Sequence, residues 1–181
     1  MVFEEKTLES EILYSGRILT LRRDRVTTSA GASTREIVVH GGGIVIAAVL
    51  EDGRIPMVRQ FRKAAEQTVL ELPAGKLEAG EDPTEAALRE LREETGYSAG
   101  RITELTAAYS SIGYSTELLR IYLAEDLTPG ETDPDPGESL EVVLLPLEEI
   151  FGMAVRGELV DLKTIAAVLL VNERLQRGGG A

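Results

Sequence analysis

The amino-acid sequence predicts an α+β fold, in which a mixed β-sheet is covered by helices and preceded by a small antiparallel β unit. Short strand patterns separated by turn residues fill residues 10–40. A continuous apolar run from Ile44 to Leu50 is typical of a central strand, and helical periodicity is clearest at 83–95. With 181 residues, the chain can bury a core in one domain that carries a small appendage.

Turn residues separate the expected elements in chain order. Glycines 41–43 form the best boundary, so we expect an N-terminal β unit at 1–40, a main domain at 41–177 and a frayed tail at 178–181. Within these parts, strands are expected at 11–14, 18–21, 35–39, 44–50, 55–60, 68–72, 102–109, 117–123 and 141–146, and helices at 83–95, 147–156 and 161–175.

Capping residues bound the helix at 83–95. Asp82 suits the N-cap, Pro83 suits the first helical position, and Gly96 suits the left-handed position just past the end. The apolar face of this helix, which includes Leu91, is expected to pack on the sheet.

The composition excludes several classes of site. The chain has 31 acidic and 19 basic residues and a formal net charge of −12, which argues against nucleic-acid binding. It contains no cysteine, so disulfides and thiolate sites are excluded, and its one histidine excludes a multi-histidine metal centre. No run of about 18 apolar residues is present, and the N-terminus lacks an apolar signal segment. We therefore expect a cytoplasmic protein without a nucleic-acid or membrane partner.

Three carboxylates lie close together on the same helix. Glu90, Glu93 and Glu94 stand at i, i+3 and i+4, and the helical wheel places Glu94 nearest the buried edge, Glu90 next and Glu93 furthest out. Like charges at this spacing repel each other by about 0.2–0.5 kcal/mol per pair. A solvated acidic face is one interpretation, and a site for a hard divalent cation such as Mg²⁺ is the other.

The surrounding sequence favours the cation site. Gly75 is followed after five residues by Glu81, and after seven more by Arg89-Glu90-Leu91-Arg92-Glu93-Glu94-Thr95-Gly96-Tyr97. This pattern resembles the Nudix box, a glycine and a glutamate followed by Arg-Glu-apolar-x-Glu-Glu-x-Gly-apolar, and all seven fixed positions are present. Only Tyr97 departs from the usual aliphatic residue.

The Nudix resemblance implies an α/β/α sandwich and a loop–helix–loop that holds Mg²⁺ or Mn²⁺ against a diphosphate. It implies that Glu90 and Glu94 are the main metal ligands. Glu93 is an additional ligand or a catalytic group beside the metal. Arg89 is expected to orient these carboxylates by ion pairing.

Other segments are similar to the ADP-ribose and nucleoside-diphosphate-sugar pyrophosphatases of the family. They are 58–62, 70–75, 161–164 and the opening around Tyr14. This branch hydrolyses a diphosphate to a nucleoside monophosphate and a sugar phosphate. It usually forms homodimers through exchanged N-terminal β units, so the resemblance implies a homodimer here as well.

The resemblance to this branch also implies roles for single residues. The carbonyl of Ala74 is expected to bind metal, and Glu71 is assigned to the same metal site. Arg62 and Arg59 are expected to contact the substrate diphosphate, for which the guanidinium is well suited. Glu138 aligns with a loop glutamate that acts as catalytic base, with Glu141 as second choice.

The substrate side of the site is less settled. Tyr114 is a candidate for stacking on a base or sugar, and Glu117 for contacting the substrate. ADP-ribose enzymes typically carry a proline where this chain has Ile112. ADP-ribose is therefore the leading substrate, GDP-mannose or another nucleotide sugar is the alternative, and a non-catalytic ligand sensor is the hypothesis from a different class.

Overall fold

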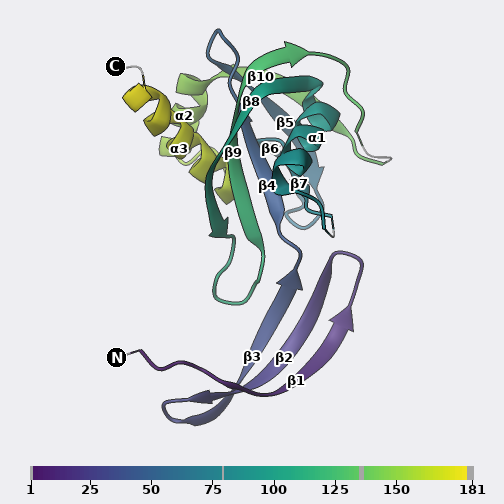
Figure 1. Ribbon diagram of the computed structural model, residues 1–181, viewed down its shortest axis with the longest axis vertical. Helices are drawn as coiled ribbons and strands as arrows, with labels where there is room; N and C mark the ends of the chain where they lie inside the picture. The colour runs from purple at the N-terminus through teal and green to yellow at the C-terminus, as the bar shows by residue number, and fades with distance from the viewer. Residues whose placement is uncertain (1, 79, 135–136, 179–181) are drawn as a thin grey trace. The chain divides into compact units, whose positions relative to one another are not determined.

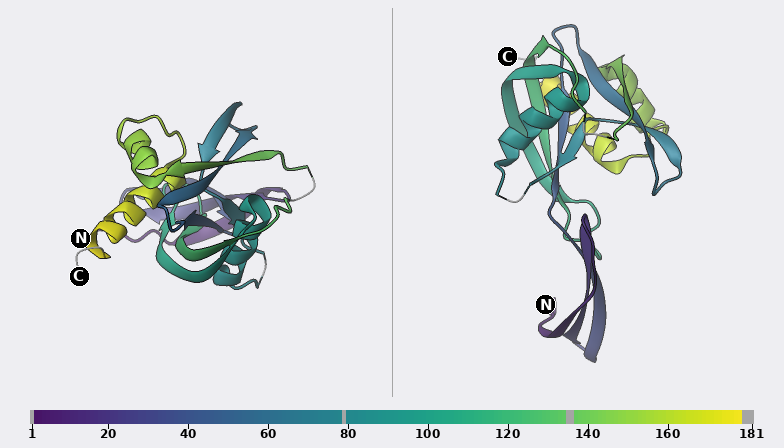
Figure 2. Two further views of the ribbon diagram at one scale, coloured as in Figure 1. Left: turned by 90° about the horizontal axis from the view of Figure 1, so that it is seen from above. Right: turned by 90° about the vertical axis from the view of Figure 1, so that its right-hand side faces the viewer.

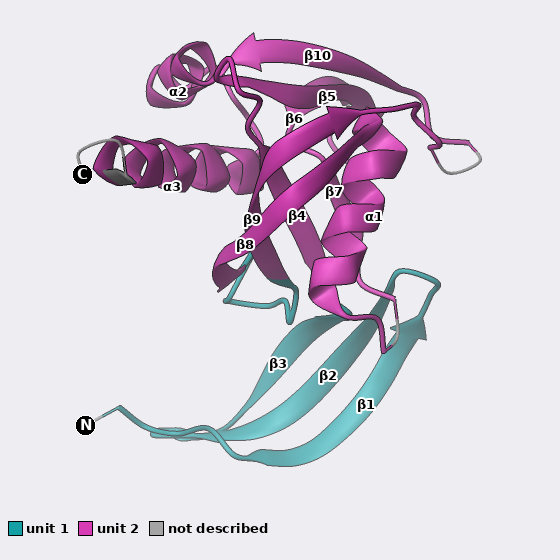
Figure 3. Ribbon diagram, turned by 45° about the horizontal axis from the view of Figure 1, so that its top comes forward, with its two compact units in different colours: residues 1–42, 109–118 teal, residues 43–108, 119–181 magenta. Residues whose placement is uncertain are grey.

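The structure, a computed structural model, describes residues 2–78, 80–134 and 137–178. The chain forms two compact units, one of Met1–Gly42 with Tyr109–Leu118 and one of Gly43–Ala108 with Leu119–Ala181 (Figure 3). The first boundary thus falls two residues later than expected, and 109–118 joins the N-terminal unit. No local pattern in the sequence had indicated that second feature. Residues 179–181 of the expected tail lie outside the described residues.

The N-terminal unit contains a three-stranded antiparallel sheet in the order β1-β2-β3, as predicted. The strands β1 (Thr7–Ser15), β2 (Leu19–Thr28) and β3 (Gly31–His40) are longer than the apolar patterns alone suggested. Charged residues extend them, since Arg23 of β2 bonds to Glu11 of β1 at 2.6 Å. Cross-strand pairs of opposite charge support strand pairing.

The second unit is built on two sheets. A mixed four-stranded sheet has the order β7-β4-β9-β8, in which β4 is parallel to β9 and antiparallel to β7. An antiparallel sheet has the order β10-β5-β6. The strands are β4 (Gly43–Ala48), β5 (Arg54–Arg62), β6 (Gln67–Glu71), β7 (Ala74–Lys76), β8 (Tyr97–Tyr109), β9 (Leu118–Pro129) and β10 (Leu140–Pro146), and the helices are α1 (Pro83–Thr95), α2 (Leu147–Val155) and α3 (Leu162–Gly178).

Both faces of the mixed sheet are covered. On one face Ile44 and Ile46 of β4 pack with Leu91 of α1 in one apolar cluster. On the other face Val45 of β4 belongs to a cluster with Val168 of α3, to which α2 and β5 also contribute. Figures 1 and 2 show α1 on one side of β4 and β9, with α2 and α3 on the other. Each buried aliphatic side chain stabilises this arrangement by about 1.5–3 kcal/mol.

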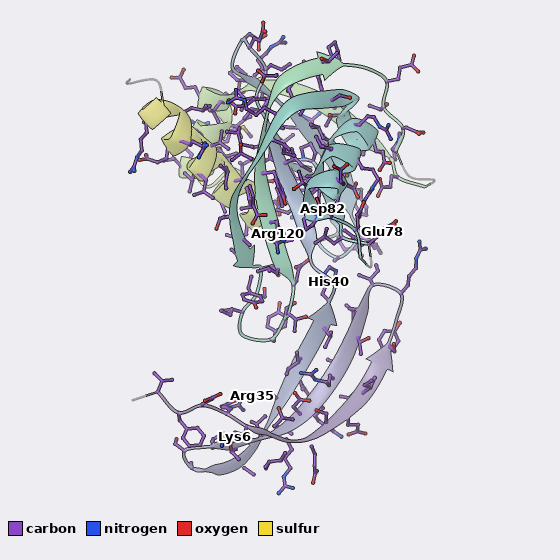
Figure 4. The ribbon with its side chains drawn as sticks, in the orientation of Figure 1. Lys6, Arg35, His40, Glu78, Asp82 and Arg120 are labelled. Atoms are coloured by element: carbon purple, nitrogen blue, oxygen red, sulfur yellow. The ribbon has the colours of Figure 1, made fainter. Side chains whose placement is uncertain are left out.

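The ends of α1 match the sequence prediction. Asp82 lies at the start of the helix (Figure 4), and its side chain accepts hydrogen bonds from the backbone N–H groups of Thr84 and Glu85. Gly96 ends the helix in the left-handed conformation, with φ of 77°. The two caps set where α1 begins and ends, and therefore which side chains face the sheet.

All other predicted elements of the second unit were also found, with shifted ends. The short strand β7 (Ala74–Lys76) was missed, because three residues are too few to show a period of two. It pairs with β4 through Gly43, Ile44 and Val45. This pairing brings Ala74 and Gly75 beside α1.

Candidate active site

One arginine on α1 holds three carboxylates. Nε and Nη2 of Arg89 donate to Glu81 at 3.0 and 3.2 Å, and Nη1 donates to both Glu90 and Glu93 at 2.9 Å. The guanidinium thereby offsets the repulsion between acidic side chains that neighbour each other on the helix. The bond from Arg89 lowers the pKa of Glu81, and these carboxylates raise the pKa of Arg89.

The burial of the three helix glutamates follows the predicted order. Glu94 is 4% exposed, whereas the side chains of Glu90 and Glu93 are 15% and 21% exposed. Glu94 accepts a hydrogen bond from the backbone N–H of Ala74 at 3.1 Å. The Glu94 carboxylate is therefore bonded to the backbone of β7, while those of Glu90 and Glu93 are bonded to Arg89 nearer the surface.

Gly75 leaves room for Glu90. A Cβ atom on Gly75 would lie 1.9 Å from Cδ of Glu90 and 2.0 Å from its Oε1. Real contacts are never this short, so any other residue at this position would displace the Glu90 carboxylate. The glycine at the start of the motif is explained by this close approach.

Burial raises the pKa of two of the carboxylates. Burial raises the pKa of Glu94 to about 8, with smaller contributions from the negative charges of Glu90 and Glu138. Burial also raises the pKa of Glu90, although the charge of Arg89 acts in the opposite direction. Both carboxyl groups therefore hold a proton more readily than an exposed glutamate does.

The loop before β10 runs past the end of α1. The backbone N–H of Asp133 donates to the carbonyl of Glu93 at 2.9 Å. Glu138, further along this loop, is exposed, and its charge contributes to the raised pKa values of Glu90 and Glu94. The structure thus brings the predicted base near the helix carboxylates.

A buried ion network lies beside them. Glu71, at the end of β6, is 1% exposed and bonds to Nε and Nη2 of Arg62 at 2.7 and 2.9 Å. It also accepts a hydrogen bond from Lys163, which donates to Asp161 at 2.8 Å. Lys163 was not singled out from the sequence. The only signal for it was the resemblance at 161–164, since a contact across 92 residues leaves no local pattern.

The remaining candidates are Arg59, Tyr114 and Glu117. Arg59 of β5 bonds to Glu141, its partner on β10, at 2.7 Å on an exposed surface. Tyr114 and Glu117 belong to the N-terminal unit, where Tyr114 is 58% exposed and Glu117 accepts a hydrogen bond from Ser110 at 2.6 Å. The second unit therefore contains the carboxylates, Ala74, Arg62 and Glu138, but not Tyr114 or Glu117.

Family models match nearly the whole chain. The model described as NUDIX domain matches residues 40–168, and the model described as nucleoside diphosphate sugar hydrolase N-terminal domain matches residues 5–38. The chain belongs to the Nudix family. The predicted resemblance is confirmed, and the chain is a Nudix hydrolase.

Individual Nudix relatives cover almost the same length. A protein of Bacillus subtilis (strain 168) named ADP-ribose pyrophosphatase is 44% identical over 178 residues, 96% of each chain. A protein of Bacillus methanolicus named methanol dehydrogenase activator is 39% identical over 170 residues, 92% of each chain. A solved structure, the crystal structure of ADP compounds hydrolase, has a TM-score of 0.87 at 24% identity and covers 100% of this chain and 99% of that one. This last likeness confirms the fold.

The Nudix family generally uses divalent metal ions, and the donor set here fits one. Glu90, Glu93, Glu94 and the backbone of Ala74 provide hard oxygen donors, and burial raises the pKa of the Glu94 carboxyl. Across the described residues, however, no three or more acidic or histidine side chains are grouped so that they could hold a metal ion.

Replacing Gly75 with alanine is expected to weaken the site. The added methyl group displaces the Glu90 carboxylate, so the Mg²⁺ concentration for half-maximal activity should rise about 10- to 100-fold. The matched control is Gly152→Ala in α2, where the added Cβ meets only the flexible end of Arg156. Equal metal requirements in Gly75→Ala and Gly152→Ala would contradict the role assigned to Gly75.

The stability of the metal-free protein is expected to fall as pH rises. The pKa of Glu94 is about 8 in the folded protein against an ordinary value of 4.5, so the folded state binds the extra proton between these pH values. The free energy of unfolding then decreases by up to about 1.4 kcal/mol per pH unit. With a chelator present, the thermal midpoint of the wild type should drop more steeply from pH 5.5 to 7.5 than that of Glu94→Gln. Equal slopes would show that Glu94 does not titrate in this range.

Proposed function

We propose that this Nudix hydrolase cleaves the diphosphate of ADP-ribose or a related nucleoside diphosphate sugar, giving a nucleoside monophosphate and a sugar phosphate, and that it uses Mg²⁺ or Mn²⁺. The observation that carries the proposal is the set of α1 carboxylates held by Arg89 beside the buried Glu94. The relative named ADP-ribose pyrophosphatase supports the substrate class.

Different residues of the chain are assigned different roles in this reaction. Glu90, Glu94 and the Ala74 carbonyl would hold the cation, with Glu93 beside them. When bound, the cation neutralises the diphosphate oxygens and lowers the pKa of water. Arg62 binds the diphosphate, and Glu138 accepts the proton of the attacking water. Water adds to one phosphorus, the bond to the bridging oxygen breaks, and that oxygen leaves with the other phosphate.

Two alternatives have specific observations behind them. GDP-mannose or another nucleotide sugar is the alternative substrate, because Ile112 stands where ADP-ribose enzymes typically have proline, and it is 82% exposed. A ligand sensor is the alternative from a different class, and the protein named methanol dehydrogenase activator shows that a relative can bear a regulatory name. The complete carboxylate set favours the enzyme.

We further propose a homodimer that forms through the N-terminal unit. Every residue of β1 is exposed, and its apolar side chains Ile12 and Tyr14 are 66% and 60% exposed. An edge strand with this much apolar surface is typical of an interface.

Among the described residues no helix is long and apolar enough to cross a membrane. The cytoplasmic location expected from the sequence remains a prediction.

A substrate panel tests the proposed activity. Wild-type protein with Mg²⁺ should release AMP and ribose 5-phosphate from ADP-ribose, and Glu94→Gln should lower kcat at least about 100-fold, because it removes a carboxylate from the cation site. GDP-mannose, other nucleotide sugars and a no-metal reaction complete the panel. Absence of wild-type turnover on every compound would favour the sensor, and full activity in Glu94→Gln would refute the metal assignment.

Sedimentation tests the dimer. The wild type should sediment as a dimer, and the double variant Ile12→Glu/Tyr14→Glu should shift toward the monomer because it places charge on the apolar strand. The control is Glu9→Gln on the same strand, which leaves the apolar residues in place. A monomeric wild type at micromolar concentration would contradict the proposed homodimer.

A further inference from the structure

The guanidinium of Arg62 is bound along one edge only. Its Nε and Nη2 atoms donate to the two oxygens of Glu71 at 2.7 and 2.9 Å. Among the described residues no hydrogen bond uses Nη1, and 43% of the side chain is exposed. Glu71 therefore fixes the plane of the guanidinium and leaves its other edge available to an anion.

Lys163 shares the carboxylate that fixes Arg62. It donates to the same Oε2 atom of Glu71 that accepts from Nη2 of Arg62. The Lys163 side chain is only 15% exposed and is held from the other side by Asp161 at 2.8 Å. The negative charge of Glu71 is thus shared between two cations, so Arg62 and Glu71 do not form an isolated pair with no net charge.

The start of α3 keeps Lys163 in this place. Asp161 accepts hydrogen bonds from the backbone N–H and the hydroxyl of Thr164 at 3.2 and 2.5 Å. The fully buried Thr164 hydroxyl also accepts a hydrogen bond from the backbone N–H of Leu72 at 2.9 Å. Because Leu72 follows Glu71 directly, these bonds fasten the end of β6 to the helix that carries Lys163.

We propose that Lys163 is a positioning residue for substrate binding. By sharing Glu71 with Arg62, it leaves the group of three side chains with a net positive charge, and the free edge of Arg62 is oriented toward the diphosphate. Glu71 is then the anchor of Arg62 and not a metal ligand, which replaces the metal role that the resemblance implied for it. This inference rests on the proposed function, because it needs a diphosphate as the anion.

Kinetics on charge variants test the role of Lys163. Lys163→Gln keeps a hydrogen-bond donor but removes the charge, so KM should rise about 10-fold, the effect of one charge-assisted contact, while kcat changes less than about threefold. Lys163→Arg restores the charge and should bring KM back to within about threefold of wild type. Lys63→Gln, the same substitution one residue after Arg62 at a residue paired with exposed Glu66, is the matched control. A purely structural role would instead alter kcat and thermal stability together.

Binding of Mn²⁺ without substrate tests the role of Glu71, and it does not depend on Lys163→Gln folding. Glu71→Gln should bind Mn²⁺, followed by electron paramagnetic resonance, within about threefold of wild type, whereas Glu94→Gln should bind it at least about 10-fold more weakly. Equal losses in both variants would make Glu71 a ligand and overturn the inference. An unchanged KM in folded Lys163→Gln would also overturn it. A wild type inactive on the substrate panel would contradict the proposed function instead.

Discussion

The hydrogen bonds of Arg89 are the interaction on which the rest of the site depends. Acidic residues at i, i+3 and i+4 of a helix repel one another. The guanidinium of Arg89 holds two of them, Glu90 and Glu93, together with Glu81 in a fixed arrangement. The capped ends of α1 and the packing of Leu91 determine which way these side chains point. Arg89 thereby holds two of the α1 glutamates in a fixed arrangement, which supports the proposed cation site over a general solvated face.

A second constraint comes from how closely β7 approaches the helix. The backbone of Ala74 bonds to Glu94, and Gly75 leaves just enough space for Glu90. These contacts remove the Glu94 carboxyl from water, and this burial raises its pKa to about 8. In the proposed function, a bound cation would offset the negative charge of these carboxylates. Part of the net charge of −12 therefore belongs to the site, and the rest covers the surface.

Features that depend on neighbouring residues were predicted from the sequence, whereas contacts between distant parts of the chain were not. Asp82 and Gly96 act within one helical turn, so the bounds of α1 were predicted correctly. The burial order of the α1 glutamates follows from helical periodicity alone. The contact of Lys163 with Glu71 spans 92 residues, and the inclusion of 109–118 in the N-terminal unit depends on pairing with β3, so neither could be deduced from a single sequence. The roles assigned by resemblance to the site residues, from Glu90 and Glu94 to Arg59, Tyr114 and Glu117, stay predictions.

The most direct measurement of the central claim is anomalous diffraction from crystals of the protein grown with Mn²⁺. We expect an anomalous peak within coordination distance of the carboxylates of Glu90 and Glu94, with Arg89 still bonded to Glu81 and Glu71 still bonded to Arg62. A peak at another place in the chain, or a peak bound by Glu71 with Arg62 displaced, would contradict it.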